Sequence, residues 1–164
     1  MTLAQQQAIE EFRRLRGTDP FGPFVALLKS PELLTRVSAL GEYLRYRSAL
    51  PPRLSEFVIL ITAAHWQQSY EWELHAPIAL KAGVAPATVD ALASGRQPAG
   101  LREDEAALYD FCRTVHGGGR GADSVRARAV HAVGEQGVID MIGICGYYAM
   151  LAMVLNMENG EGVR

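Results

Sequence analysis

Apolar residues recur along most of this chain at intervals of three and four positions, and proline or glycine residues interrupt the pattern repeatedly. This spacing places apolar side chains on one face of an α-helix, and the interruptions are typical of helix ends. We find no convincing alternation of apolar and polar residues, which would indicate a half-buried strand. The pattern therefore predicts an all-α fold, a bundle of seven or eight helices that holds more than half of the residues. The predicted helices are residues 3–16, 31–50, 54–66, 70–82, 86–94, 101–116, 124–133 and 138–155.

One predicted helix is unusual, because the stretch from Val138 to Leu155 is almost entirely apolar. Its length is at the lower limit for crossing a membrane, but Asp140 places a charge inside it. We interpret it as a central helix that other helices bury on most sides, not as a membrane span. Small residues at every third position, Gly143, Gly146 and Ala149, would let a neighbouring helix approach closely.

The chain has 164 residues, of which 49% are hydrophobic and 21% are charged. This size and composition predict a single domain, residues 1–164, with a sizeable core. The formal net charge is -2 and the pI is near 6.1, so the chain lacks the basic field that binds nucleic acids or anionic membranes. Two cysteines cannot form a disulfide framework, and the amino terminus lacks an apolar run of signal-peptide type. We therefore expect a cytoplasmic protein.

The sequence lacks the common motifs for metals, cofactors and phosphates. Neither H-E-x-x-H nor a Cys/His cluster occurs around the four histidines. The glycine-rich GGGRG at 117–121 lacks the Lys-Ser/Thr pair of a phosphate-binding loop. Cys112 and Cys145 are far apart on apolar segments, and we interpret them as buried, unreactive thiols. We expect neither a metal nor a cofactor.

The segment from Leu54 to Gly83 carries residue types suited to catalysis. Glu56 lies in a nearly continuous apolar helix, where an acid is costly unless it faces water, a partner or a site. Glu71 and His75 are four positions apart and share a helical face with Trp72. A carboxylate beside an imidazole can fix its tautomer. Spacing alone leaves two interpretations open, an ordinary ion pair on a helix surface or a catalytic pair.

The same segment resembles the carboxymuconolactone decarboxylase family, which includes the alkylhydroperoxidase D-like proteins. The residues that carry the resemblance are RLSE at 53–56, the apolar run at 57–64, YEWELH at 70–75 and PIALKAG at 77–83. The later stretch GEQGVIDMIGICGYYAMLAMVLN looks like the closing helix of the family, and the match extends over roughly residues 20–157. The resemblance implies a helical homo-oligomer, either a trimer or a hexamer built as a trimer of dimers.

The two branches of that family differ at the site. The peroxidase branch has a Glu followed by C-x-x-C and then a His, and here Glu56 and His75 match that pattern. The two cysteine positions hold Gln68 and Glu71, so no peroxidatic thiol is present there. The decarboxylase branch has a Glu-aromatic-x-x-His motif, which Glu71, Trp72 and His75 match. The resemblance therefore favours decarboxylase-like chemistry.

This resemblance implies a cofactor-free lyase that acts on a small carboxylated lactone or a related acid. His75 would be the general acid/base, and Glu71 and Glu56 would orient it or relay its proton. The candidates for binding the substrate are Trp72, Tyr70, Gln68 and Arg53, with Arg45 as a second candidate for holding a carboxylate. Two alternatives stay open: a peroxiredoxin- or alkylhydroperoxidase-like redox protein of the same family, and an oligomeric small-molecule-binding protein without catalysis.

Overall fold

A computed structural model describes residues 1–119 and 123–158 of the chain, so the GGGRG segment is described only as far as Gly119. This part of the chain contains eight helices and no strand, and the structure is 78% helical. The all-α prediction is therefore confirmed. The helices are α1 (Leu3–Arg16), α2 (Pro23–Leu27), α3 (Pro31–Tyr46), α4 (Pro52–His65), α5 (Ser69–Ala82), α6 (Pro86–Ala93), α7 (Glu103–His116) and α8 (Asp123–Glu158).

Most helix ends lie close to their predicted positions, because capping residues hold them. Thr2 forms a capping box with Gln5 at the start of α1, and Gly17 ends this helix in the left-handed conformation. Gly83 ends α5 in the same way. Proline occupies the first position of α2, α3, α4 and α6, where the missing N–H has no intrahelical partner to lose.

The sequence pattern does not predict α2, since five residues are too few for a periodic apolar pattern. Phe24 and Leu27 of this helix are buried. The Phe24 ring packs against Phe12 and Phe21 at centroid distances of 5.0 and 5.5 Å. Tertiary packing, and not helix propensity, therefore stabilises this short element.

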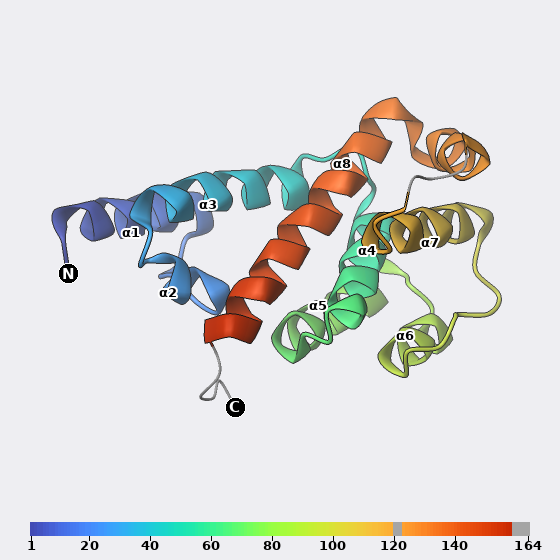
Figure 1. The fold of residues 1–164 in the computed structure, drawn as a ribbon, viewed down its shortest axis with the longest axis horizontal. Coiled ribbons are helices and arrows are strands. Elements are labelled where there is room, and N and C mark those ends of the chain that lie inside the picture. Colours follow the sequence, from blue (N-terminus) through green and yellow to red (C-terminus); the bar gives the residue numbers. More distant parts are fainter. Residues whose placement is uncertain (120–122, 159–164) are drawn as a thin grey trace.

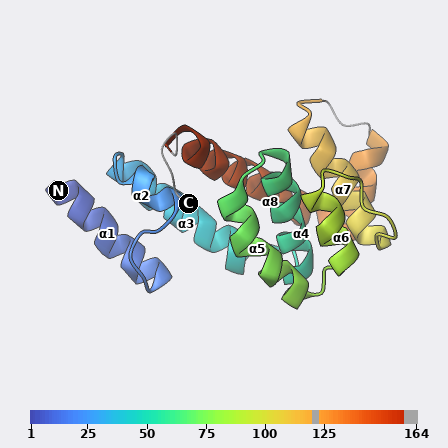
Figure 2. The same ribbon diagram turned by 90° about the horizontal axis from the view of Figure 1, so that it is seen from below.

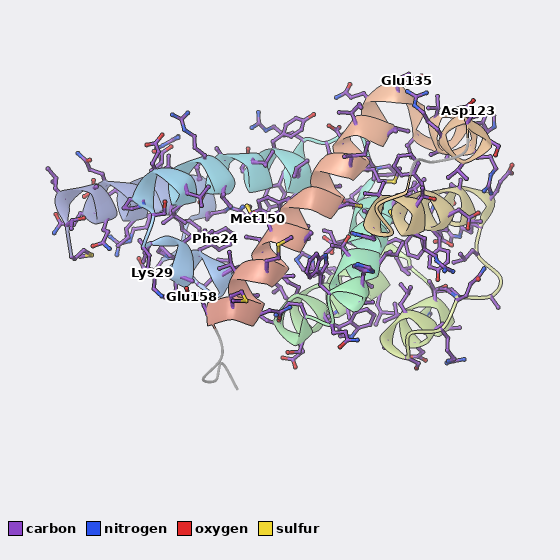
Figure 3. The ribbon with its side chains drawn as sticks, viewed as in Figure 1. Phe24, Lys29, Asp123, Glu135, Met150 and Glu158 are labelled. Carbon is purple, nitrogen blue, oxygen red and sulfur yellow. The ribbon has the colours of Figure 1, made fainter. Side chains whose placement is uncertain are left out.

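α8 runs through the middle of the molecule and separates the other helices into two groups (Figure 1). The helices α1, α2 and α3 lie on one side, and α4 to α7 lie on the other, as the view from below also shows (Figure 2). Both groups pack against α8, the first through α2 and α3 and the second through α4 and α7. An ion pair between Lys29 and Glu158 joins the chain after α2 to the end of α8 (Figure 3).

α4 is the central helix of the second group, since it packs against α5, α6, α7 and α8. All of its residues from Leu54 to Ala63 are buried, which explains the nearly continuous apolar sequence. α5 follows α4 in the chain and packs closely against it. Side chains from the two helices therefore meet at one interface, and Glu56 is among the buried ones.

α8 consists of two helical parts that meet at a kink, where Gly134 adopts φ 75° and ψ 172°. The predicted break in this region is confirmed, although it is limited to that one residue. Asp140, the charge in the apolar run, is buried and accepts hydrogen bonds from the Tyr43 hydroxyl (3.0 Å) and the Ala49 N–H (2.8 Å). These donors from α3 and the loop after it satisfy the acid, so the core tolerates it.

By length and composition alone, α8 is also able to cross a membrane, and it is the one such helix in the described chain. Of its most apolar 18-residue window, 56% is buried inside the protein. The predicted burial therefore holds for somewhat more than half of this stretch. The remainder is half-buried or exposed, and Ile139, Ile142 and Met153 are among its exposed side chains.

Candidate functional site

Three ionisable side chains that the sequence singles out lie together between α4 and α5. Nδ1 of His75 is 2.7 Å from Oε2 of Glu56, and Nε2 of His75 is 3.6 Å from Oε2 of Glu71. The first distance is that of a hydrogen bond, whereas the second is too long for one. α5 supplies Glu71 and His75 from one face, one helical turn apart, and α4 supplies Glu56. We call Glu56, Glu71 and His75 the acid–histidine triplet.

The contact with Glu56 fixes the orientation of the His75 ring. A carboxylate accepts a hydrogen bond from Nδ1–H, and this tautomer directs the Nε2 lone pair toward Glu71. Tyr148 of α8 meets the imidazole edge-on, with 5.1 Å between ring centroids. Nε2 is therefore the ring atom that is available for proton transfer.

The triplet is almost completely removed from solvent. The exposed fractions are 7% for Glu56, 3% for Glu71 and 1% for His75. Burial disfavours the charged carboxylate and raises the pKa of Glu71 to about 7, although the positive charge of Arg45 acts in the opposite direction. Glu71 is consequently able to exist in either protonation state near neutral pH, which suits a group that exchanges a proton with an imidazole.

A small cavity of about 20 Å³ lies beside the triplet, which is room for about one water molecule. Side chains from five helices and the loop before α2 form its wall, so the site depends on both helix groups. The lining residues are Arg16, Phe21, Pro23, Phe24, Arg45, Tyr70, Glu71, Leu74, His75, Tyr147, Tyr148 and Leu151.

Two arginines bring positive charge to this cavity. Arg45 of α3 is close enough to lower the pKa of Glu71. Arg16 of α1 makes only long contacts through Nη2, which is 3.4 Å from the Ser38 carbonyl oxygen and 3.5 Å from the Tyr147 hydroxyl. Its Nε atom is buried and has no hydrogen-bond partner. An unsatisfied buried donor is unfavourable, so this N–H is suited to an anionic ligand.

Of the residues predicted to bind substrate, Tyr70 and Arg45 line this cavity. Trp72 and Gln68 line a different, more open hollow between α5 and α6. Gln68 also caps the start of α5 by accepting a hydrogen bond from the Tyr70 N–H, and its side-chain amide donates to Asn156 of α8 at 2.7 Å. The structure thus gives Gln68 a local structural contact away from the triplet.

Arg53 lies outside the cavity wall. Its guanidinium forms ion pairs with Asp104 and Glu105 at the start of α7. Because both carboxylates already satisfy this arginine, the structure does not bring it to the triplet, and Arg45 and Arg16 are the cations that lie there.

Arg16, Tyr147 and Tyr148 are the polar cavity residues that the sequence pattern does not reveal. The two tyrosines interrupt the apolar run of α8, and that interruption is a usable signal, because a buried tyrosine hydroxyl needs a polar neighbour. Burial raises the pKa of Tyr147 to about 12, so its hydroxyl remains a donor at neutral pH. Arg16 carries no such signal, since it is one of three arginines in the last turn of α1.

The chemistry of this arrangement is proton transfer next to an anion-binding group. His75 has one ring nitrogen free, and Glu71 either donates a proton or, when ionised, accepts one. Two guanidinium groups lie on the cavity wall. Within residues 1–119 and 123–158, no group of three or more His, Cys, Asp and Glu side chains is arranged to hold a metal ion.

Comparison with known proteins identifies the segment that carries the triplet. The family model of the Carboxymuconolactone decarboxylase family matches residues 31–110, which include Glu56, Glu71 and His75. No curated protein matches the chain. Arg16 and Tyr147 lie outside the matched residues, so part of the cavity wall comes from the rest of the chain. The segment 31–110 belongs to the carboxymuconolactone decarboxylase family, which supports a decarboxylase-like or alkylhydroperoxidase-like role at the level of the family.

Proposed function

We propose that the protein is a cofactor-free lyase that removes carbon dioxide from a small carboxylated lactone or a related acid. The observation that carries this proposal is the buried His75 imidazole, held by Glu56 at 2.7 Å and facing Glu71 beside the cavity. The family match over residues 31–110 supports a decarboxylase-like or alkylhydroperoxidase-like role at the level of the family.

The reaction requires a sink for electrons and a source of protons. When the bond between the substrate and its carboxylate breaks, the electron pair passes into the conjugated lactone and forms a dienolate. Glu71 first passes its proton to Nε2 of His75, and the resulting imidazolium delivers that proton to the dienolate carbon. A proton from solvent then restores Glu71. Glu56 keeps the ring oriented and stabilises its positive charge before the transfer. Each step uses a group of the acid–histidine triplet.

Two positively charged side chains would hold an acidic substrate. Arg45 and Arg16 line the same cavity as His75, and Nε of Arg16 has no hydrogen-bond partner. Their charges would bind a carboxylate in the ground state and stabilise the dienolate oxygen as it develops. The hydroxyl of Tyr147 adds a hydrogen-bond donor at the same place. This arrangement favours a substrate with more than one oxygen anion or acceptor.

Binding such a substrate requires part of the cavity wall to move, because about 20 Å³ holds no more than a water molecule. Phe21, Pro23 and Phe24 at α2 cover the cavity, and the Tyr70 ring lies directly against Gly22. The triplet itself rests on the α4–α5 pair. Displacement of α2 would therefore admit a substrate without disturbing the triplet.

The small cavity also favours one alternative, in which the triplet is a structural polar network of a non-catalytic, oligomeric binding protein. The redox alternative within the family is less favoured at this site, since Gln68 and Glu71 occupy the positions of the two thiols. A turnover screen of carboxylated lactones and β-keto acids, followed by carbon dioxide release, distinguishes catalysis from binding.

The decisive variant is His75→Ala, assayed on the substrate that the screen identifies. Loss of a general acid/base lowers the rate on the order of 100- to 10,000-fold, so we expect a loss in this range from a protein that stays folded. His131→Ala, at an exposed histidine of α8, is the matched control and should retain full activity. Unfolding of His75→Ala with no turnover by the parent protein would instead support the structural network.

We further propose that the protein works in the cytoplasm as a homo-oligomer, a trimer or a hexamer, and binds neither nucleic acid nor membranes. The net charge of -2 supports the absence of a nucleic-acid partner. The exposed apolar face of α8 supports self-association.

A further inference from the structure

A second cluster of reactive groups lies between α7 and α8, apart from the acid–histidine triplet. Cys112 of α7 and Cys145 of α8 are both buried, with exposed fractions of 0% and 1%. Their sulfur atoms are 3.7 Å apart. A disulfide bond needs about 2.05 Å, so small side-chain rotations would close the remaining gap. Two thiols that are distant in the sequence are therefore neighbours in the fold.

Two polar side chains, those of His116 and Thr62, lie near Cys145. Both groups act to favour the thiolate of Cys145 and so lower its pKa. Nε2 of His116 is 3.0 Å from Oγ1 of Thr62, and this hydroxyl already donates to the Val58 carbonyl oxygen. The Thr62 oxygen must then accept from His116, so Nε2 carries a proton. An imidazole N–H beside a sulfur atom stabilises a negative charge there.

The pair of thiols is also asymmetric. Contact with the Cys112 thiol and the proximity of His116 and Thr62 lower the pKa of Cys145, although burial acts in the opposite direction. The pKa of Cys112 is raised, because its thiol lies against Cys145 and is itself buried. Cys145 is therefore the nucleophile of the pair, and Cys112 is the thiol that keeps its proton.

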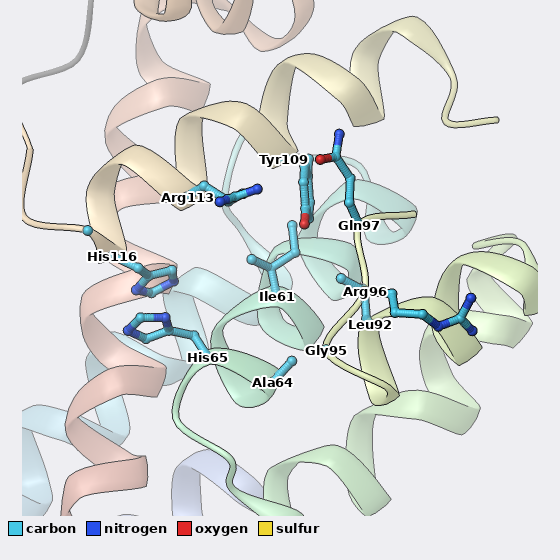
Figure 4. A pocket seen from close by; sticks show the side chains of 11 residues that line it. Ile61, Ala64, His65, Leu92, Gly95, Arg96, Gln97, Tyr109, Arg113 and His116 are labelled. Carbon is cyan, nitrogen blue, oxygen red and sulfur yellow. The ribbon is translucent and has the colours of Figure 1, made fainter. Parts of the chain in front are cut away.

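An open pocket lies next to this cluster, and His116 is the residue that the two share. It has a volume of about 460 Å³, and the imidazoles of His65 and His116 form part of its wall (Figure 4). The two rings stack at 4.7 Å between centroids. Arg113 and Tyr109 of α7 line the same pocket. His116 thus belongs both to the pocket wall and to the surroundings of Cys145, and a small oxidant would reach the thiols only past this side chain.

We propose that Cys112 and Cys145 are a redox-active pair, which a small hydroperoxide entering by the His65–His116 pocket oxidises to a disulfide between α7 and α8. The oxidation is a modification of the protein that is separate from the decarboxylation proposed at His75. It requires a hydroperoxide as oxidant, and an external dithiol reverses it.

The oxidation balances in two steps. The Cys145 thiolate attacks one oxygen of hydrogen peroxide, the O–O bond breaks, and Cys145 becomes a sulfenic acid. The hydroxide that leaves combines with the proton that Cys145 had lost, which gives the first water molecule. The Cys112 thiol then attacks the Cys145 sulfur, so the S–S bond forms, the S–O bond breaks and the second water leaves. Two thiols and one peroxide thus yield one disulfide and two waters.

The test is oxidation of the native, full-length protein with hydrogen peroxide, followed by intact-mass analysis and a peptide map without reduction. We expect the loss of two hydrogen atoms and a cross-linked pair of peptides that contain Cys112 and Cys145, both reversed by dithiothreitol. In Cys112→Ser, a sulfenic acid should be trapped at Cys145, whereas Cys145→Ser should yield none at Cys112. Circular dichroism checks that both variants fold.

His116→Gln measures the role of the pocket without removing either thiol. It should slow oxidation on the order of tenfold near neutral pH, since each unit by which a thiol pKa rises above the working pH lowers the thiolate fraction tenfold. His131→Gln, at an exposed histidine, should leave the rate unchanged. The proposal is overturned if the native protein keeps both thiols in excess peroxide, if it forms only sulfinic acid, or if the purified protein holds a metal ion on the two cysteines.

Discussion

At the scale of single residues, the fold changes the ionisation of Glu71. Its carboxyl group is 3% exposed, and burial raises its pKa from the ordinary value of 4.5 to about 7. The nearby Arg45 opposes this shift but does not cancel it. A carboxyl group with this pKa is a proton donor and acceptor at neutral pH, which a surface glutamate is not.

The raised pKa of Glu71 makes the folded protein less stable as the pH rises. Between about pH 4.5 and 7 the folded protein keeps the Glu71 proton while the unfolded chain releases it, so the free energy of unfolding falls with rising pH. The shift corresponds to a loss on the order of 3 kcal/mol by mildly alkaline pH. We expect Glu71→Gln, which stays neutral, to lose this part of the pH dependence in urea denaturation.

Glu73→Gln serves as the matched control, because Glu73 is on the same helix but exposed. It should unfold with the pH dependence of the parent protein. Identical pH profiles for Glu71→Gln and the parent would mean that Glu71 is not buried in its uncharged form.

At the scale of elements, the sequence predicts what depends on local spacing and misses what depends on tertiary contacts. The caps and glycines give the bounds of α5, and spacing of four residues puts Glu71 and His75 on one face. The 2.7 Å contact between His75 and Glu56 depends on how α5 packs on α4. The spacing of residues along the sequence does not predict that packing. The approach of Cys112 to Cys145 has the same origin, since it arises where α7 packs on α8.

Helix packing also decides which glycines can be replaced. Gly41 in α3 is buried, and a Cβ there would overlap the Tyr147 hydroxyl and the Arg16 guanidinium, both in the cavity wall. At Gly146 in α8, by contrast, a Cβ would meet no atom within 4 Å. Both lie inside helices, where alanine is intrinsically preferred over glycine. The difference between the two substitutions therefore measures packing alone.

We expect Gly41→Ala to destabilise the protein by about 1–3 kcal/mol, the usual effect of overpacking. Gly146→Ala should instead stabilise the isolated subunit by about 0.5–1 kcal/mol, because it lowers the entropy of the unfolded chain. Denaturant midpoints of the two variants check both signs. Stabilisation by Gly41→Ala would contradict the close contact between α3, Tyr147 and Arg16.

At the scale of the whole molecule, α8 presents an apolar stripe that no other part of the described chain covers. Ile139, Ile142 and Met153 are 62%, 43% and 45% exposed, and their spacing puts them on one face with the open position at Gly146. Gly143, by contrast, faces Leu44 of α3 within the same chain. Exposed apolar faces of this kind are typical of subunit interfaces. We therefore propose that a second copy of the chain covers this stripe.

The expected result of this arrangement is that Ile142→Lys shifts the protein toward smaller species. A lysine in the centre of an apolar interface loses its hydration and gains no partner, so association weakens while the fold of each chain is kept. Sedimentation velocity at micromolar concentration measures the change, and circular dichroism confirms the helix content. Leu3→Lys is the control, because Leu3 is 71% exposed on α1 and lies outside the stripe. A parent protein that sediments as a monomer, or an Ile142→Lys variant that assembles as the parent does, would exclude the stripe as the interface.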